Sequence, residues 1–222
     1  MTNKIKVKEI FSSIQGEGPF IGYKQLFIRF CGCNLNCNYC DTDFDAEKSN
    51  TYSTEELLSI VEKNKDCHSI SLTGGEPLLH TEFLKEFLPK CTLPIYLETN
   101  ATLAEKLSEI IEFVEYVSAD IKLPSCTGLP ELWEVHDKFF EVAKSKKLFA
   151  KVVFDDKITD FEINSVINLV KKYQIETILQ PKMNGNDLSV NNKFIEFTLD
   201  KFLAKYNKVR LIPQVHKFLD VR

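Results

Sequence analysis

Short β-rich runs alternate with helical patterns along the chain, and this alternation constrains the fold more than any other feature. Several runs are continuously apolar, as strands covered on both faces tend to be. Repeated β-then-α units predict a parallel sheet with helices on its outside. The runs cover residues 6–11, 25–30, 69–72, 94–98, 116–121, 148–154, 176–180 and 209–212.

Helix starts are marked by capping-box spacings, in which Ser or Thr precedes Glu by three residues. The pairs are Ser53 with Glu56, Thr102 with Glu105, and Thr159 with Glu162. A further helix is expected over residues 131–144. The predicted fold class is α/β, a TIM-like β/α barrel. We expect a partial barrel, because 222 residues are short for eight complete units.

Length and composition favour one globular domain over residues 1–222. Hydrophobic residues make up 44% and charged residues 27%, and the formal net charge is −4. Nothing in this balance favours nucleic acid as a partner. No apolar run reaches the ~20 residues of a membrane span, and the charged N-terminus lacks a signal-peptide core. We therefore expect a cytoplasmic protein without a membrane partner.

Three cysteines, Cys33, Cys37 and Cys40, follow the run at residues 25–30 in a C-x3-C-x2-C spacing. Three thiolates can hold a 4Fe–4S cluster and leave one iron for another ligand. The cluster loop is expected at about residues 31–45. An alternative is a zinc site with Cys31 as fourth ligand, although Cys31-Gly32-Cys33 is a cramped pairing. Seven cysteines in a reducing compartment argue against a disulfide framework.

Thr73-Gly74-Gly75-Glu76 ends the run at residues 69–72. Two adjacent glycines let a ligand approach the backbone, and carbonyls and the Glu76 carboxylate can accept hydrogen bonds from an ammonium group. The alternative is an ordinary turn after a strand.

Polar residues also end other β-rich runs. Because chemistry in a β/α barrel is carried at the carboxyl ends of its strands, these residues are expected around one mouth. A polar residue at a strand end is commonplace, so each alone has a structural alternative. They are Glu98, Thr99, Asn100, Ser118, Asp120, Lys122, Lys151 and Gln180.

The cysteine spacing, with Tyr39 before the last cysteine, resembles the cluster motif of the radical S-adenosylmethionine (SAM) superfamily. There, SAM binds the open iron of a 4Fe–4S cluster through its amino and carboxylate groups. Reductive cleavage of SAM gives methionine and a 5′-deoxyadenosyl radical that abstracts hydrogen from the substrate. The resemblance implies that Gly74, Gly75 and Glu76 hold the SAM amino group. It also implies SAM contacts at Thr99, Asn100, Ser118, Lys122 and Gln180.

The order of QGEG, the cysteine motif with Cys-Asp-Thr, TGGEP, ETN, LQP and QVHK resembles the 7-carboxy-7-deazaguanine synthase family. The resemblance runs from about Phe11 to the C-terminus. That family converts 6-carboxy-5,6,7,8-tetrahydropterin to 7-carboxy-7-deazaguanine and ammonia, on the route to queuosine and other 7-deazapurines. It regenerates SAM in each cycle. The resemblance also implies Mg²⁺, a homodimer, and flavodoxin or ferredoxin as reductant.

Residues before and after the cluster motif have side chains that suit the polar groups of a pterin. Gln15 can donate and accept hydrogen bonds, Glu17 can accept from an amino edge, and Arg29 offers a planar fork to a carboxylate. His216 could move a proton during loss of ammonia. With Glu17 and His216 as catalytic candidates, the expected substrate-binding residues are Gln15, Gly16, Glu17, Gly18, Arg29, Thr73 and His216. The resemblance implies Thr42 as the Mg²⁺ ligand, with Asp41 in a structural role.

Two rival functions remain open. A glycyl-radical activase would keep the cysteines and the GGE motif but act on a protein. A non-catalytic iron–sulfur or zinc protein would leave the strand-end motifs without a purpose. At single positions, Arg29 could form a plain ion pair and His216 could be a surface histidine. Ala101 and Cys31 depart from the family pattern without removing a functional group.

Overall fold

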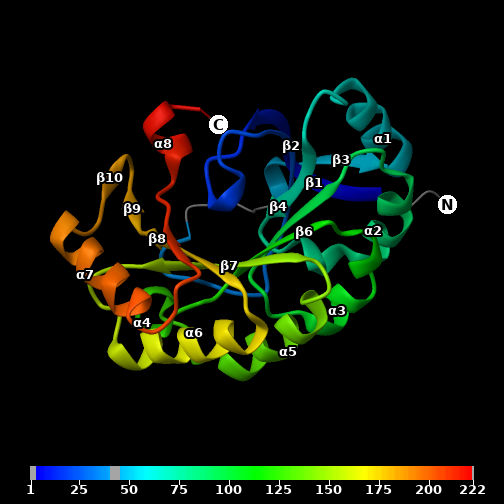
Figure 1. Ribbon diagram of the computed structural model, residues 1–222. Coiled ribbons are helices and arrows are strands. Elements are labelled where there is room, and N and C mark those ends of the chain that lie inside the picture. The colour runs from blue at the N-terminus through cyan, green and yellow to red at the C-terminus, as the bar shows by residue number, and fades with distance from the viewer. Residues whose placement is uncertain (1–3, 41–45, 222) are drawn as a thin grey trace.

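The computed structural model describes residues 4–40 and 46–221 and is dominated by one nine-stranded sheet (Figure 1). Its parallel strands, in spatial order, are β2 (Lys24–Phe30), β4 (Ser69–Gly74), β5 (Ile95–Thr99), β6 (Tyr116–Asp120), β7 (Lys147–Phe154), β8 (Glu176–Pro181) and β11 (Val209–Leu211). The strand order ends at β11 without returning to β2. The predicted class, a partial β/α barrel, is therefore confirmed.

Helices cover the outer face of this sheet, as Figure 1 shows for α5 and α6. The helices are α1 (Thr54–Lys63), α2 (Thr81–Phe87), α3 (Ala104–Ser108), α4 (Pro124–Thr127), α5 (Trp133–Ala143), α6 (Asp160–Tyr173), α7 (Asn192–Leu203) and α8 (Val215–Leu219). The 3-10 turns are η1 (Gly18–Phe20), η2 (Ala46–Lys48), η3 (Pro77–His80), η4 (Leu88–Lys90) and η5 (Ile111–Phe113). Strands β9 (Met183–Asn184) and β10 (Asp187–Leu188) form a small separate hairpin. The main core lies between sheet and helices, where Phe139, Phe140 and Val170 are fully buried.

The N-terminal strands differ from the all-parallel expectation. β1 (Lys4–Ile14) pairs antiparallel with β2, and β3 (Asn50–Ser53) pairs antiparallel with β1 at the sheet edge. Only residues 15–23 join β1 to β2. A parallel crossover needs a dozen or more residues, so this connection can form only a hairpin.

Two of the three predicted capping boxes are confirmed. Ser53 with Glu56 caps α1, and Thr159 with Glu162 caps α6, each through reciprocal side-chain hydrogen bonds. The prediction for Thr102 is wrong, since α3 begins after Leu103 without a side-chain cap. The Thr102 hydroxyl instead donates to Asn100 Oδ1 at 2.5 Å. The Thr102 hydroxyl is thus bonded to Asn100 at the barrel mouth and does not cap α3.

Among the residues described, no helix combines the length and apolar character needed to cross a membrane.

Candidate active site

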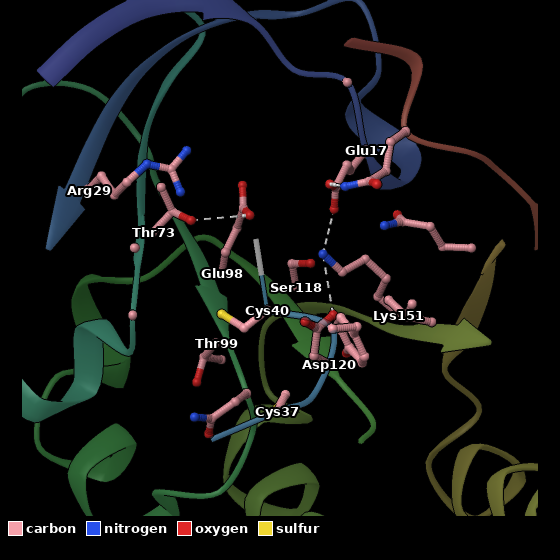
Figure 2. A pocket seen from close by; sticks show the side chains of 18 of the residues that line it. Glu17, Arg29, Cys37, Cys40, Thr73, Glu98, Thr99, Ser118, Asp120 and Lys151 are labelled. Atoms are coloured by element: carbon pink, nitrogen blue, oxygen red, sulfur yellow. Dashed lines mark hydrogen bonds and ion pairs between the residues drawn. The ribbon is translucent and has the colours of Figure 1, made fainter. Parts of the chain in front are cut away.

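One cavity of about 540 Å³ opens among the carboxyl ends of the parallel strands and gathers most of the predicted site residues (Figure 2). This volume lies within the range of small-molecule sites. The predicted residues that line it are Gln15, Gly16, Glu17, Arg29, Cys33, Cys37, Cys40, Thr73, Gly74, Gly75, Thr99, Asn100, Ser118, Lys122, Gln180 and His216. Segments far apart in the chain therefore meet in one place, as the barrel rule predicted.

The three motif cysteines lie within residues 33–40, and all three line this cavity. Burial raises the pKa of the Cys33 and Cys37 thiols. Asn38 N donates to Thr127 O at 2.9 Å and ties the loop to α4. Three soft donors on one cavity fit a cluster with an open iron. Cys31 is buried instead, with its carbonyl hydrogen-bonded to His80, so it does not complete a zinc set.

The glycine pair packs against the cluster loop, which gives a second reason for glycines there besides the predicted approach of a ligand. A Cβ on Gly74 would lie 2.3 Å from Phe30 O, and one on Gly75 would lie 1.8 Å from Gly32 O. Gly74 also has a φ of +122°, which side-chain-bearing residues rarely adopt. The glycines thus admit the backbone of the cluster loop, and their own backbone still borders the cavity.

Glu76 is fully buried and holds this loop in place. Its Oε1 accepts from Leu78 N at 3.0 Å and Thr99 Oγ1 at 2.9 Å, while Oε2 accepts from Asn100 N at 2.8 Å. Burial raises its pKa to about 7 despite these donors. Glu76 is absent from the cavity lining among the described residues. Its contact with SAM stays a prediction.

Asn100 and Gln180 offer polar groups to the cavity, and Asn100 does so beside Cys33. Asn100 Nδ2 donates to Asn34 Oδ1 at 2.8 Å and lies 3.8 Å from Cys33 Sγ, which links β5 to the cluster loop. Gln180 Oε1 is a buried acceptor without a hydrogen-bond donor. A ligand with an amino or hydroxyl donor would satisfy it.

A series of alternating charges lines the cavity, and Figure 2 shows the part of it formed by Asp120, Lys151 and Glu17. Lys122 Nζ lies 2.9 Å from Asp120 Oδ2 and 3.2 Å from the Tyr39 hydroxyl, beside Cys40. Burial opposes the charge of Lys122, but Asp120 and Tyr39 hold its pKa above its usual value. Lys151 Nζ lies 3.3 Å from Asp120 Oδ1 and continues the series towards Glu17.

Glu17 lies at the other end of this series. Its Oε2 accepts from Lys151 Nζ at 2.5 Å and its Oε1 from Gln214 Nε2 at 2.8 Å. Burial alone would raise the pKa of Glu17, but the charge and hydrogen bond of Lys151, the Gln214 hydrogen bond and His216 lower it to about 2. Glu17 is therefore a carboxylate at neutral pH and can accept hydrogen bonds but not donate a proton.

Gln15 and Glu98 line the same cavity, and Gln15 links Glu98 to the loop of Glu17. Gln15 Nε2 donates to Glu98 Oε1 at 3.0 Å, and Gln15 Oε1 accepts from Glu17 N at 3.0 Å. Glu98 also accepts from Ser71 and Thr73. The side-chain amide of Gln15 is thus already oriented within the protein, and it fixes the loop that carries Glu17.

Arg29 and Thr73 lie on the opposite side of the cavity from Glu17 in Figure 2. Arg29 Nε forms an ion pair with Glu9 Oε1 at 2.7 Å, and both residues line the cavity. Phe11 stacks on Phe27 with ring centroids 5.0 Å apart in the same cross-strand register. Glu9, Phe11 and Phe27 were missed. Phe27 lies two residues before Arg29, and Glu9 lies two residues before Phe11. This spacing was the available signal, because alternate residues share a strand face.

His216 reaches the cavity from the C-terminal segment. Val215 N donates to Gly16 O at 2.9 Å, and a Cβ on Gly16 would lie 2.5 Å from the His216 side chain. Gly18 packs beneath the site against Phe149 and the Tyr96 hydroxyl, away from the cavity lining. Its predicted substrate contact stays a prediction. Asp41 and Thr42 lie outside the described residues.

Comparison with known proteins agrees with this arrangement. Residues 27–144 match the radical SAM superfamily. A 7-carboxy-7-deazaguanine synthase of Geobacter sulfurreducens is 36% identical, and alignment covers 96% of both chains. The corresponding enzyme of Archaeoglobus fulgidus is 39% identical over 96% of this chain and 97% of its own.

Solved structures show the same fold. The crystal structure of QueE from Escherichia coli has a TM-score of 0.68 at 22% identity, covering 96% of this chain and 95% of that one. The three motif cysteines, the GGE loop and the loop of Gln15 to Gly18 thus occur in a chain that matches its relatives over nearly its whole length. The chain belongs to the 7-carboxy-7-deazaguanine synthase family of the radical SAM superfamily.

Proposed function

We propose that this chain converts 6-carboxy-5,6,7,8-tetrahydropterin to 7-carboxy-7-deazaguanine and ammonia, as part of queuosine and 7-deazapurine biosynthesis. The observation that carries the proposal is that the three cysteines and the residues Gln15, Gly16 and Glu17 line the same cavity. Family membership supports the reaction, and the one nine-stranded sheet supports a single functional domain.

The cysteine side is proposed to bind the cofactors. Cys33, Cys37 and Cys40 would hold a 4Fe–4S cluster, and SAM would complete it. When bound there, these groups would supply the 5′-deoxyadenosyl radical for hydrogen abstraction, with SAM regenerated in each cycle. Gly74 and Gly75 keep the backbone close to the cluster loop, while Thr99, Asn100, Ser118, Lys122 and Gln180 provide the polar wall.

Glu17 and Arg29, which lie on opposite sides of the cavity (Figure 2), are proposed to bind the pterin between them. The ionised Glu17 suits the N–H donors of a pterin edge, because a carboxylate only accepts hydrogen bonds. Arg29 suits the substrate carboxylate, and its ion pair with Glu9 positions the guanidinium. Since Glu17 carries no proton to give, His216 is the candidate for proton transfer during ammonia loss.

Mg²⁺ is proposed beside the substrate carboxylate, with Thr42 as its protein ligand. A hard cation with few protein oxygens and several from water or substrate is chemically reasonable. A flavodoxin or ferredoxin is proposed as reductant, which the exposure of Cys40 supports. A homodimer is proposed from the family, and a cytoplasmic setting is supported by seven free cysteines.

The test is an anaerobic assay of the reconstituted protein with reductant, Mg²⁺, SAM and the pterin, followed by mass spectrometry. We expect 7-carboxy-7-deazaguanine without matching loss of SAM. Slow SAM cleavage without deazaguanine would reject this substrate and return the glycyl-radical activase to consideration. Absence of SAM cleavage from a verified cluster would favour the non-catalytic alternative.

A further inference from the structure

Lys151 is a buried cation that neither the family motifs nor the proposed chemistry assigns a role. It lies in the middle of β7, between Ala150 and Val152, which are fully buried. Its side chain is 10% exposed and points into the cavity (Figure 2). A lysine ammonium is rarely so buried unless something pairs with it.

Two carboxylates from different elements share this ammonium. Glu17 Oε2 lies 2.5 Å away on the loop between β1 and β2, and Asp120 Oδ1 lies 3.3 Å away at the end of β6. The charge of Glu98 on β5 also acts on Lys151. Burial disfavours the charged lysine, yet these acidic groups raise its pKa well above the usual value. Lys151 is therefore a fixed positive charge.

The loop that carries Glu17 depends on few supports. Glu17 is held through its backbone by Gln15 and through its carboxylate by Lys151 and Gln214. Gln214 itself belongs to a C-terminal segment whose helix α8 has no buried residue. Lys151, in contrast, projects from a central strand. Of these two carboxylate partners, it is the one anchored in the barrel core.

We propose that Lys151 is a positioning residue that aims the Glu17 carboxylate at the N–H edge of the pterin. This inference rests on the proposed function and deepens it. Lys151 acts through Glu17. By binding Oε2 it fixes the orientation of the Glu17 carboxylate in the cavity. A carboxylate held in this way accepts from amino and amide donors and disfavours an acceptor edge, because two facing acceptors repel.

The charge state gives the proposal a distinctive signature. When Lys151 is replaced by the neutral Met, its charge no longer offsets the burial of Glu17. The pKa of Glu17 should then rise above the ordinary carboxyl value of about 4.3. His216 and Gln214 remain near it, while Asp120 and Glu98 add negative charge. Substrate binding should then weaken as pH falls, because a protonated Glu17 loses an acceptor.

The experiment compares Lys151→Met and Lys151→Arg with wild-type holoenzyme between pH 5.5 and 8.5. In Lys151→Met we expect the pterin KM to rise about tenfold or more at pH 7.5, the scale of one lost charge-assisted hydrogen bond. We also expect a new acidic limb in kcat/KM. Lys151→Arg should restore most of the KM, and Glu17→Gln should remove the new limb from Lys151→Met.

Lys147→Met is the matched control, since Lys147 lies on the same strand with its side chain 65% exposed and pairs with Glu115. It should leave KM and the pH profile unchanged. A Lys151→Met enzyme that loses kcat alone, or that shows the wild-type pH profile, would overturn the proposal. So would additive effects of Lys151→Met and Glu17→Gln, because coupled residues are non-additive.

A substrate-independent measurement separates this proposal from the proposed function. Infrared titration of the reconstituted protein near pH 5.5 should show one protonated carboxyl band more in Lys151→Met than in wild type, and the double variant with Glu17→Gln should lack this extra band. The buried Glu76, whose pKa is raised to about 7, contributes the same band to all three proteins. The extra band would support the role of Lys151 even if wild type fails to convert the pterin. Its absence from Lys151→Met would reject the role whatever the substrate.

Discussion

At the scale of single residues, the site depends on charges that the protein pairs before any ligand arrives. Glu17, Arg29 and Lys122 each have a named partner within 3 Å. Paired and buried charges keep their orientation at little entropic cost, which suits binding sites that must hold a geometry. Substituting one partner therefore tests orientation as well as charge.

Arg29→Ala is expected to raise the KM for the pterin by ~10- to 100-fold, because a bidentate contact to a carboxylate is lost. SAM binding should change little, since Arg29 is not among the residues expected to contact SAM and its Nε is paired with Glu9. Substrate and SAM titrations of the reconstituted protein measure both. Equal weakening of the two would assign Arg29 a purely structural ion pair with Glu9.

His136 makes a stability prediction that depends on pH. It is fully buried, accepts from Lys122 N through Nε2 at 3.1 Å and bonds to Ala101 O through Nδ1. Burial lowers its pKa to about 4, against 6.5 for the free side chain. Between these values the unfolded chain binds the proton first, so the His136 contribution is complete above pH 6.5 and is lost as pH falls towards 4.

His136→Gln should therefore lose stability at pH 7.5, by ~1–3 kcal/mol, and lose less as pH falls towards 5. Urea unfolding of both proteins across this range gives the difference curve. Buried Glu76, whose raised pKa acts with the opposite sign, cancels in that difference. Parallel curves for the two proteins would rule out a neutral His136 in the folded state.

At the scale of elements, contacts between loops decide the cluster site. The GGE loop and the cluster loop interlock because Gly75 N donates to Phe30 O at 3.2 Å and Glu76 N to Gly32 O at 2.8 Å. Gly32, Gly75 and Glu76 lie outside any helix or strand, so the two loops depend on each other there. Helices α1 and α6, by contrast, are fixed by their own capping boxes and apolar faces.

Gly75→Ala is expected to impair cluster assembly, because its Cβ would lie 1.8 Å from Gly32 O and must displace one loop. We expect iron content after reconstitution to fall by half or more, with far-ultraviolet circular dichroism unchanged. Gly22→Ala is the control. Its Cβ would meet nothing within 4 Å, although its φ of +92° costs about 1 kcal/mol. Normal iron content in Gly75→Ala would show that cluster assembly does not depend on this close contact between the two loops.

At the scale of the whole molecule, the sequence was most informative where local pattern and tertiary role coincide. Every predicted β-rich run overlaps a strand, and the mouth residues meet because parallel strands end at one edge. The antiparallel hairpin does not follow from the β-then-α alternation, because the connection at residues 15–23 is too short for a parallel crossover. The bond of Thr102 to Asn100 and the packing of the glycine pair on the cluster loop involve tertiary neighbours, which spacing does not reveal.

The C-terminal segment completes the site from outside the barrel. Residues after β11 fold back over the N-terminal hairpin, where Figure 1 places α8 beside the loop after β1. This segment brings Gln214 to Glu17 and His216 to Gly16, yet α8 has no buried residue. Its contacts therefore belong to the substrate side of the cavity and contribute little to the barrel core.

Deletion of residues 213–222 should thus leave the fold and cluster intact but separate SAM cleavage from product formation. We expect an unfolding midpoint close to wild type and continued slow SAM cleavage, since the cysteine side of the cavity keeps its residues. Deazaguanine formation should fall at least a hundredfold, because the proton-transfer candidate His216 and the Gln214 support of Glu17 are both removed. Deletion of residues 219–222 is the matched control and should retain product formation. If the longer deletion also abolished SAM cleavage or unfolded the protein, the segment would be part of the barrel's stability rather than a substrate-side wall.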